Sequence, residues 1–483
     1  MKSPAIYKIL GVLLILFSTS MLPPIAVSLI TQDGVSHTFM LAFLLILGLG
    51  ACCWYPTRKY KGELRFRDGF FVVVLFWLGL GLMASLPLIL LEDPVISIVD
   101  AIFESMSGLT TTGATILVSI DDLAPSILYY RQQLQWFGGM GIIVLAVAVM
   151  PMLGIGGMQL YRAETPGPVK DNKLTPRITE TAKALWYIYL GLTIICALAY
   201  YFAGMSPFDA LSHAFSTVAI GGFSTHDASL GYFQSVQVNL VATVFMFLAG
   251  LNFGLHFVAF RSRRIAAYLD DPEAKAYSMI ILAMAIVTIF TLLYFDVFDS
   301  VHETFVQGIT QVVSIVTTTG FTTTDFSTWP TFLPVLLILL STVGGCAGST
   351  AGGMKVIRSM LLYKQGAREI KKLVHPNAMI PIKIGRKAVN DNIINAVWGF
   401  LSLYIMSYLI LLIMLLAAGV DPITAFSAIT ACLNNLGPGL GDVAANYASI
   451  NDFGKGILVF AMLLGRLELF TLLVMFSRTF WKG

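Results

Sequence analysis

The chain has 483 residues, of which 57% are apolar and only 12% charged, and its formal net charge is +3. Soluble proteins carry about 25% charged residues, so the composition excludes a water-soluble globular fold and predicts a membrane protein. The net charge itself says little, and we expect a lipid bilayer and no nucleic acid as the chain's surroundings. The five cysteines lack metal-ligand spacing, so we expect reduced packing residues and no covalently bound cofactor.

Apolar runs long enough to cross a bilayer occur ten times along the chain, since a spanning helix needs about 20 such residues. They lie near residues 5–30, 37–56, 69–91, 132–153, 184–204, 237–260, 276–296, 331–363, 393–418 and 455–479. The first run lacks a cleavage site and is expected to be a helix rather than a signal peptide. The predicted fold class is therefore an all-α polytopic membrane protein with ten transmembrane helices.

The basic residues predict how these helices are oriented. Lysines and arginines gather before the first run, after the last run and in every second connection, whereas the other connections carry acids. The positive-inside rule places the basic connections in the cytoplasm. We therefore expect both termini to be cytoplasmic.

Four further apolar segments, each too short to cross, lie between spans on the outer side. They align on Gly113, Gly222, Gly320 and Gly437, with small residues six and twelve positions before each glycine. Segments of this length in a membrane protein are candidates for re-entrant helices. The chain is thus predicted to have two N-terminal helices (1–66) followed by four pore repeats (67–165, 166–268, 269–375 and 376–483) around a pseudo-fourfold axis.

Re-entrant half-helices explain the polar cluster that follows each of them. Non-helical backbone at membrane depth is tolerated where it lines a water-filled path or is buried in protein. Its carbonyls are free to face a cation, and glycine permits the dihedral angles that align them. Asp100 and Asp209 fall at the outer starts of the first two half-helices, where we expect them to cap N–H groups and to form a negative outer mouth.

The order of motifs resembles the Trk/Ktr/HKT superfamily of potassium transport proteins over the whole chain. The resemblance rests on "TTTGAT" (110–115), "AIGGFST" (219–225), "TTTGFTT" (317–323), "GGCAGSTAGGMK" (344–355), "NNLGPG" (434–439) and "GRLEL" (465–469). It implies uptake of the potassium ion as substrate across a bacterial inner membrane. It also implies a homodimer controlled by a cytoplasmic nucleotide-binding (NAD/ATP) subunit of the TrkA type.

The resemblance also implies a potassium filter built from backbone carbonyls of the four loops. Its residues would be Thr111, Thr112, Gly113, Ile220, Gly221, Gly222, Thr318, Thr319, Gly320, Asn435, Leu436 and Gly437. In this family a glycine in the first loop accompanies selection of potassium over sodium, and Gly113 fits. The fourth loop departs from the pattern because Pro438 follows its glycine, so an unequal ring is expected.

Five glycines interrupt the eighth span: Gly344, Gly345, Gly348, Gly352 and Gly353. Glycine inside a helix costs about 1 kcal/mol. Close helix packing through small residues is one interpretation, but five glycines in ten residues favour a loop that breaks the helix. A phosphate-binding loop is disfavoured because no Lys-Ser/Thr pair follows. By resemblance, the loop lies below the filter and blocks the ion path until activation.

Arg466 lies inside the last span, where a charge is expensive and usually functional. A salt bridge with Glu468 has poor geometry, because residues two apart face different sides of a helix. We therefore expect Arg466 to lie on the ion path and to hold the Gly-rich loop closed through that loop's carbonyls.

Two alternatives to a gated potassium pore stay open. A proton-coupled potassium symporter needs alternating access and usually a titratable group at mid-membrane, and the outer acids do not provide one. An intramembrane enzyme needs a catalytic cluster, and the chain contains neither HExxH nor GxSxG. The sequence therefore favours a gated conduit and no enzymatic activity.

Overall fold

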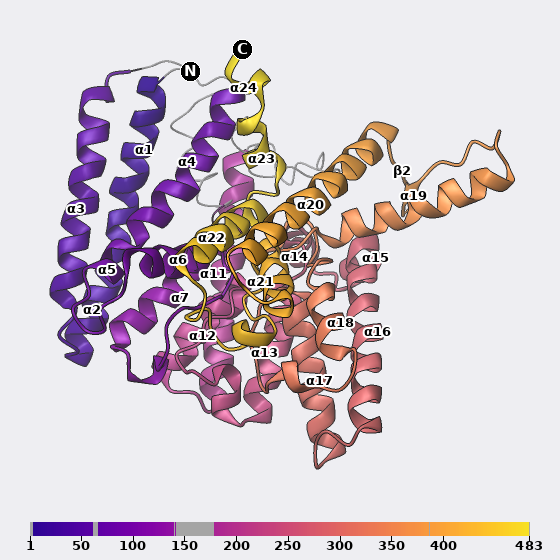
Figure 1. Ribbon diagram of the computed structural model, residues 1–483, viewed down its shortest axis with the longest axis horizontal. Coiled ribbons are helices and arrows are strands. Elements are labelled where there is room, and N and C mark those ends of the chain that lie inside the picture. Colours follow the sequence, from indigo (N-terminus) through magenta and orange to yellow (C-terminus); the bar gives the residue numbers. More distant parts are fainter. Residues whose placement is uncertain (1–2, 61–65, 140, 142–177, 386, 483) are drawn as a thin grey trace.

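The computed structural model describes residues 3–60, 66–139, 141, 178–385 and 387–482. These residues are mostly helical, and their only sheet is the hairpin of β1 (Lys383–Ile384) and β2 (Lys387–Ala388). Figure 1 shows that α1 begins and α24 ends at the same end of the molecule.

The N-terminal helices form a separate group at one side of the bundle (Figure 1). They are α1 (Ser3–Ser18), α2 (Leu22–Thr31) and α3 (Ser36–Trp54). The backbones of α1 and α3 touch where they cross, because a Cβ added to Gly11 would lie 2.8 Å from the Gly50 carbonyl oxygen. Small residues at the crossing therefore set the close packing of this pair.

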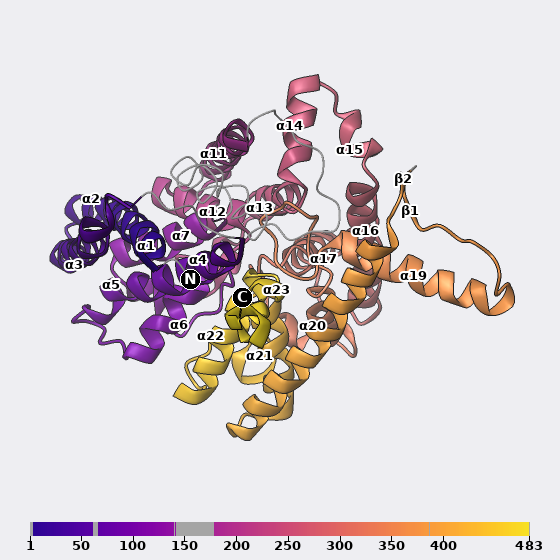
Figure 2. The same cartoon turned by 90° about the horizontal axis from the view of Figure 1, so that it is seen from above.

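The rest of the chain is built from four units of helix, short helix and helix. Their elements are α4 (Phe66–Ala84), α6 (Ile98–Leu109) and α7 (Pro125–Gly139); α11 (Ile178–Phe202), α12 (Pro207–Ala219) and α13 (Val236–Ala249); α16 (Pro272–Tyr294), α17 (Val301–Val316) and α18 (Leu333–Leu340); and α20 (Asp391–Ala417), α21 (Pro422–Asn434) and α22 (Asp452–Arg466). Seen from above, the units surround a common centre in chain order (Figure 2).

Helix contacts close these units into a ring. Each short helix contacts the first helix of its own unit: α6 with α4, α12 with α11, α17 with α16, and α21 with α20. Each also contacts the last helix of the preceding unit: α12 with α7, α17 with α13, and α21 with α18. The contact of α22 with α6 joins the fourth unit to the first.

The remaining elements lie within the units, between them, or towards the two ends of the chain. The helices are α5 (Leu86–Ile89), α14 (Phe253–Ser262), α15 (Ala266–Asp270), α19 (Val356–Val374), α23 (Phe470–Leu473) and α24 (Arg478–Lys482). The 3-10 turns are η1 (Thr19–Met21), η2 (Tyr55–Thr57), η3 (Ile120–Asp122), η6 (Ser229–Phe233), η7 (Phe326–Thr328), η8 (Gly441–Val443) and η9 (Val474–Phe476). In both views α19 and the hairpin project away from the bundle (Figures 1 and 2).

Six helical segments of the described chain are long and apolar enough to cross a membrane. They are Pro4–Thr31, Ser36–Thr57, Asp68–Ile89, Lys183–Phe202, Pro272–Tyr294 and Asp391–Ala417, and two bent helix pairs would raise the number to eight. The predicted fourth span, 132–153, runs into residues outside the described part. The total of ten spans therefore stays a prediction, as do the four boundaries between the five predicted segments.

Three predicted spans are broken near the centre of the bundle. The sixth bends by 94° between α13 and α14, and the tenth by 110° between α22 and the segment that starts at Phe470. The eighth stops at Leu340 and resumes as α19 at Val356. Only the third of these breaks was indicated by glycines. At α14, the Asn252 side chain accepts a bond from Gly254 N (2.7 Å) and caps a new helix start, which apolar composition does not reveal.

Candidate ion-conducting site

The four short helices end in the same way. In each, the backbone N–H of the residue before the aligned glycine donates to a carbonyl oxygen near the helix end, and the N–O distance is 2.8 Å in all four. The bonds run from Thr112 N to Ser107 O, Gly221 N to Ser216 O, Thr319 N to Ser314 O, and Leu436 N to Ala431 O. The residue before that donor is left-handed, with φ of 55° at Thr111, 56° at Ile220, 65° at Thr318 and 56° at Asn435. This is the Schellman arrangement that ends a helix and turns the chain.

Left-handed backbone is unusual for these side chains. Threonine and isoleucine are β-branched and rarely adopt positive φ. Strain of this kind persists only where the surroundings enforce it, and it clusters at functional sites. Its repetition at equivalent positions shows that the loops share one backbone geometry despite their different sequences.

The aligned glycines bring the four loops into contact as a closed ring. Gly113, Gly222, Gly320 and Gly437 have φ of 81°, 79°, 83° and 95°. A Cβ on each would collide with a carbonyl oxygen of the next loop: Gly113 with Gly221, Gly222 with Thr319, Gly320 with Leu436, and Gly437 with Thr112. The contacts run through the loops in chain order and return to the first. A side chain at any of these positions would force the ring apart.

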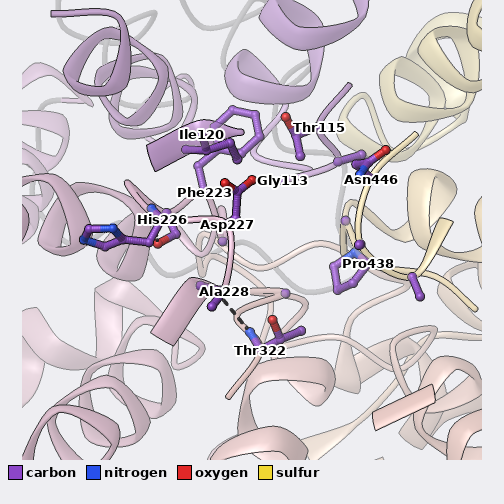
Figure 3. A pocket seen from close by; sticks show the side chains of 18 of the residues that line it. Gly113, Thr115, Ile120, Phe223, His226, Asp227, Ala228, Thr322, Pro438 and Asn446 are labelled. Carbon is purple, nitrogen blue, oxygen red and sulfur yellow. Dashed lines mark hydrogen bonds between the residues drawn. The ribbon is translucent and has the colours of Figure 1, made fainter. Parts of the chain in front are cut away.

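A cavity of about 620 Å³ lies against one side of this ring. All four glycines line it, together with residues that follow them in each loop. In Figure 3, Gly113 and Thr115 of the first loop, Phe223 of the second, Thr322 of the third and Pro438 of the fourth surround the opening. The cavity is therefore a vestibule shared by all four units.

Most of the predicted filter carbonyls have no protein hydrogen-bond donor among the described residues. Of the twelve, only Gly221 O and Gly437 O accept such bonds, from Gln135 Nε2 (2.6 Å) and the Tyr447 hydroxyl (2.7 Å). Buried carbonyls in proteins are normally paired, and residues such as Thr112, Thr319 and Leu436 are fully buried. Buried carbonyls without a protein donor are suited to a desolvated cation.

The acids expected at the outer mouth require a correction. The capping residues are Ser97 and Ser206, which accept bonds from the backbone N–H of Asp100 and Asp209 at 3.1 Å. Asp100 instead pairs with Lys455 Nζ at 2.5 Å. Neither aspartate lines the vestibule, whose lining acids are Asp227 and Asp325. A helix start was predicted correctly, but serine three positions earlier is the cap.

A polar cluster joins the outer parts of the first two units. His226 Nδ1 lies 2.5 Å from Asp121 Oδ1, and the His226 ring stacks on Tyr232. Burial raises the pKa of Asp121, but hydrogen bonds from His226 and the Asp227 backbone outweigh this and hold the pKa below its ordinary value. Asp121 therefore stays ionised at neutral pH. The hydrogen bonds to its carboxylate stabilise the fold there, and this stabilisation is lost as the pH falls through the lowered pKa.

The Gly-rich loop, residues 344–353, crosses directly beneath the ring. Gly352 N donates to Thr318 Oγ1 (2.7 Å), and Gly353 N donates to Asn434 O (3.1 Å) at the end of α21. Thr350 Oγ1 donates to Val218 O (3.0 Å) at the end of α12. Ala351 packs in a small cluster with Ile220 and Ala249. The loop thus contacts the bases of the second, third and fourth predicted filter loops.

Two fixed points hold this loop from the side. Glu273 on α16 accepts bonds from Ala347 N (2.7 Å) and Ile357 N (3.1 Å). Cys346 N donates to Gly250 O (2.8 Å) at the break between α13 and α14. Gly344, Gly348 and Gly353 have φ of 69°, 76° and 69°, which other residues adopt only with strain.

Arg466 links the Gly-rich loop to the first predicted filter loop. Its guanidinium donates to Thr350 O (3.2 Å), Thr111 Oγ1 (2.9 Å) and Gly138 O (2.6 Å). The residue ends α22 instead of lying inside a continuous helix. Glu468 pairs with Arg358 at 2.5 Å, so the acid two positions away is engaged elsewhere. The predicted filter and gate residues therefore meet in one place, whereas Asp100 and Asp209 lie apart from them.

Several polar side chains behind the loops were not anticipated: Arg131, Gln135 and Tyr447. Tyr447 joins the fourth loop to the first, because its hydroxyl bonds Gly437 O and its N–H bonds Thr115 O (2.7 Å). The run "RQQLQ" at 131–135 is unusually polar for the start of a predicted span and was the available signal. The described residues contain no group of three or more His, Cys, Asp or Glu suited to a metal ion.

Comparison with known proteins now bears on this geometry. A family model described as "TrkH: Cation transport protein" matches residues 35–482. The chain belongs to the TrkH family. The expectation of a transport protein, and not an enzyme, is confirmed by this membership.

Relatives within the family cover the chain from end to end. The Trk system potassium uptake protein TrkH of Vibrio parahaemolyticus is 56% identical and covers 100% of both chains, and that of Escherichia coli K12 is 54% identical over 99% of both. The E. coli protein TrkG is 41% identical, over 98% of this chain and 97% of its own. The crystal structure of the potassium transporter TrkH from V. parahaemolyticus matches with a TM-score of 0.92 and 53% identity over 100% of both chains.

Proposed function

We propose that this chain is a potassium-selective uptake protein of a bacterial inner membrane, and that potassium passes through the centre of the four-loop ring. The observation that carries the proposal is the closed ring itself, in which ten of the twelve predicted filter carbonyls have no protein donor among the described residues. Rings of backbone carbonyls replace a cation's hydration shell in selective channels. The names of the TrkH relatives indicate potassium as the cation.

The Gly-rich loop and Arg466 form the gate of this proposed path. The loop bonds to residues at the base of the ring, and Arg466 bonds to both the loop and Thr111. A positive charge beneath a cation filter also repels the ion. Opening then requires the loop to move away from the ring, which breaks its bond to the guanidinium.

Control of this gate is assigned to a partner, in line with the family. The proposed assembly is a homodimer with a cytoplasmic nucleotide-binding subunit of the TrkA type. The gate is held at Gly250, Glu273 and Ile357. The partner would therefore open it by moving one of the adjoining helices, α14, α16 or α19.

The test is uptake of radioactive rubidium by liposomes that contain the purified chain, with potassium or sodium added as competitor. The proposal predicts uptake that potassium blocks and sodium does not. Gly113→Ser should reduce this preference, because a side chain at Gly113 collides with the Gly221 carbonyl. Gly191→Ser is the matched control, since nothing lies within 4 Å of a Cβ at Gly191. Equal inhibition by both ions in the unmodified chain would contradict the proposal.

A further inference from the structure

A buried ion pair lies behind the first two filter loops. Arg131 on α7 and Glu104 on α6 are each 1% exposed, and Arg131 Nε lies 2.8 Å from Glu104 Oε1. Charged groups are seldom fully buried unless they are paired. Neither charge belongs to the gate or contributes a filter carbonyl, so the pair needs a separate explanation.

The pair holds the chain immediately after two of the aligned glycines. Glu104 accepts bonds from the Thr115 hydroxyl and from Ile116 N, both at 3.0 Å, in the first loop. Arg131 Nη1 donates to Ser224 O (3.1 Å) in the second loop. Its guanidinium also lies over the Phe223 ring, 4.3 Å from the centroid. One guanidinium thus connects the first loop to the second.

Gln135 extends the same support by one helical turn. Residues four apart lie on the same face of a helix, and Gln135 reaches the second loop alongside Arg131. Its Nε2 donates to Gly221 O (2.6 Å), and its Oε1 accepts from Phe223 N (3.1 Å). The amide therefore bridges the backbone on both sides of Gly222.

The equivalent positions in the other units show that this support is unequal. Nine residues before the aligned glycine stand Glu104, His213, Gln311 and Ala428. His213 Nε2 bonds the Ser224 hydroxyl (2.9 Å), which again holds the second loop. Both amide atoms of Gln311 are buried without a partner among the described residues, and Ala428 has no polar side chain. The side chains of Arg131, Glu104 and Gln135 are together called the brace. Among the described residues, the charged pair of this brace supports only the first two loops.

We propose that Arg131, Glu104 and Gln135 are positioning residues that set the spacing between the first and second loops and so determine discrimination between potassium and sodium. This inference rests on the proposed function. Sodium is smaller than potassium, so a filter that holds its carbonyls apart disfavours sodium. The pair carries no net charge, so it supplies geometry without repelling the ion.

The test compares rubidium uptake and its inhibition by sodium in liposomes that contain the full chain. Three variants are used: Arg131→Lys, which keeps the charge but lacks the planar fork; Gln135→Leu, which removes no charge; and the double variant Glu104→Gln with Arg131→Gln, which leaves no unpaired buried charge. Gln311→Met is the matched control behind the third loop. Folding is checked for each by thermal unfolding and gel filtration.

We expect each folded brace variant to lose about tenfold in preference for rubidium over sodium, equivalent to about 1.4 kcal/mol, while rubidium uptake persists. Gln311→Met should keep the preference of the unmodified chain. A merely structural role would lower rubidium uptake and leave its inhibition by sodium unchanged. Gln135→Leu retains the ion pair and is the variant that keeps the test decisive if the others fail to fold.

The outcomes separate this inference from the function on which it rests. If the unmodified chain shows no preference for potassium over sodium, the proposed function fails. If the unmodified chain is selective and Gln135→Leu and the other folded brace variants are equally selective, only the brace is overturned.

Discussion

Replacing Arg466 by alanine removes the side chain that joins the proposed gate to the proposed filter. The guanidinium donates to Thr350 O in the Gly-rich loop, to Thr111 Oγ1 in the first filter loop and to Gly138 O at the end of α7. Of these three bonds, the one to Thr350 must break when the loop moves away. The substitution should therefore favour the open state.

The size of the effect follows from that bond. A hydrogen bond from a charged donor contributes about 1.5–3 kcal/mol, and every 1.4 kcal/mol is tenfold in an equilibrium. Loss of the Thr350 bond alone should then raise the open fraction, and with it the basal rate of rubidium uptake, by about 10- to 150-fold. Removing the positive charge beneath the ring acts in the same direction.

The assay is rubidium uptake by liposomes with Arg466→Ala, compared with the unmodified chain at equal protein content. Arg466→Lys keeps the charge but cannot reach three acceptors with one planar group, so its rate should lie between the two. Arg261→Ala, on the exposed end of α14, is the control. A folded Arg466→Ala protein whose uptake equals that of the unmodified chain would refute the gate assignment.

Three further predictions concern the gate, the ion coupling and the outer ion pair. Deleting residues within 344–353 should raise basal rubidium uptake, and a folded deletion variant with unaltered or absent uptake would reject the loop as a gate. Uptake driven by a potassium gradient alone should not need a pH gradient; a strict requirement for one would favour the proton-coupled symporter. Asp100→Asn leaves Lys455, which is 5% exposed, without its carboxylate. This substitution should lower the free energy of unfolding by about 1–3 kcal/mol, less than the loss of a fully buried pair because Asp100 is partly exposed. Asp452→Asn is the control, and an equal unfolding temperature for the two variants would contradict the prediction.

Features that recur at fixed spacing were predictable from the sequence. The aligned glycines marked four loops, and positive φ at each glycine is the conformation that glycine adopts without cost. Glycines also marked the loop at 344–353, which lies where α18 and α19 are separated. Helix geometry correctly disfavoured a pair between Arg466 and Glu468, because Glu468 bonds Arg358. These features could be predicted because each depends on residues within a single helical turn or a single loop.

Features that depend on remote partners were not predictable. Asp100 was expected to cap a helix, but its partner Lys455 lies 355 positions away. The link from Arg131 to Ser224 and the bond of Tyr447 to Thr115 join different units in the same way. The breaks after α13 and α22 lie at polar residues, Asn252 at the first and Arg466 and Glu468 at the second, inside runs that are apolar enough as a whole to pass for continuous spans. These contacts follow from how the ring closes, which no local pattern encodes.

The central claim is that carbonyls from four loops of one chain hold the transported cation. It is tested most directly by a crystal structure with rubidium replacing potassium, with the ion located by its anomalous scattering. The account predicts a peak on the ring axis in contact with the carbonyls of Thr112, Gly221, Thr319 and Leu436. A peak bound only by carboxylates of the vestibule, such as Asp227 or Asp325, with none on the ring axis, would contradict it.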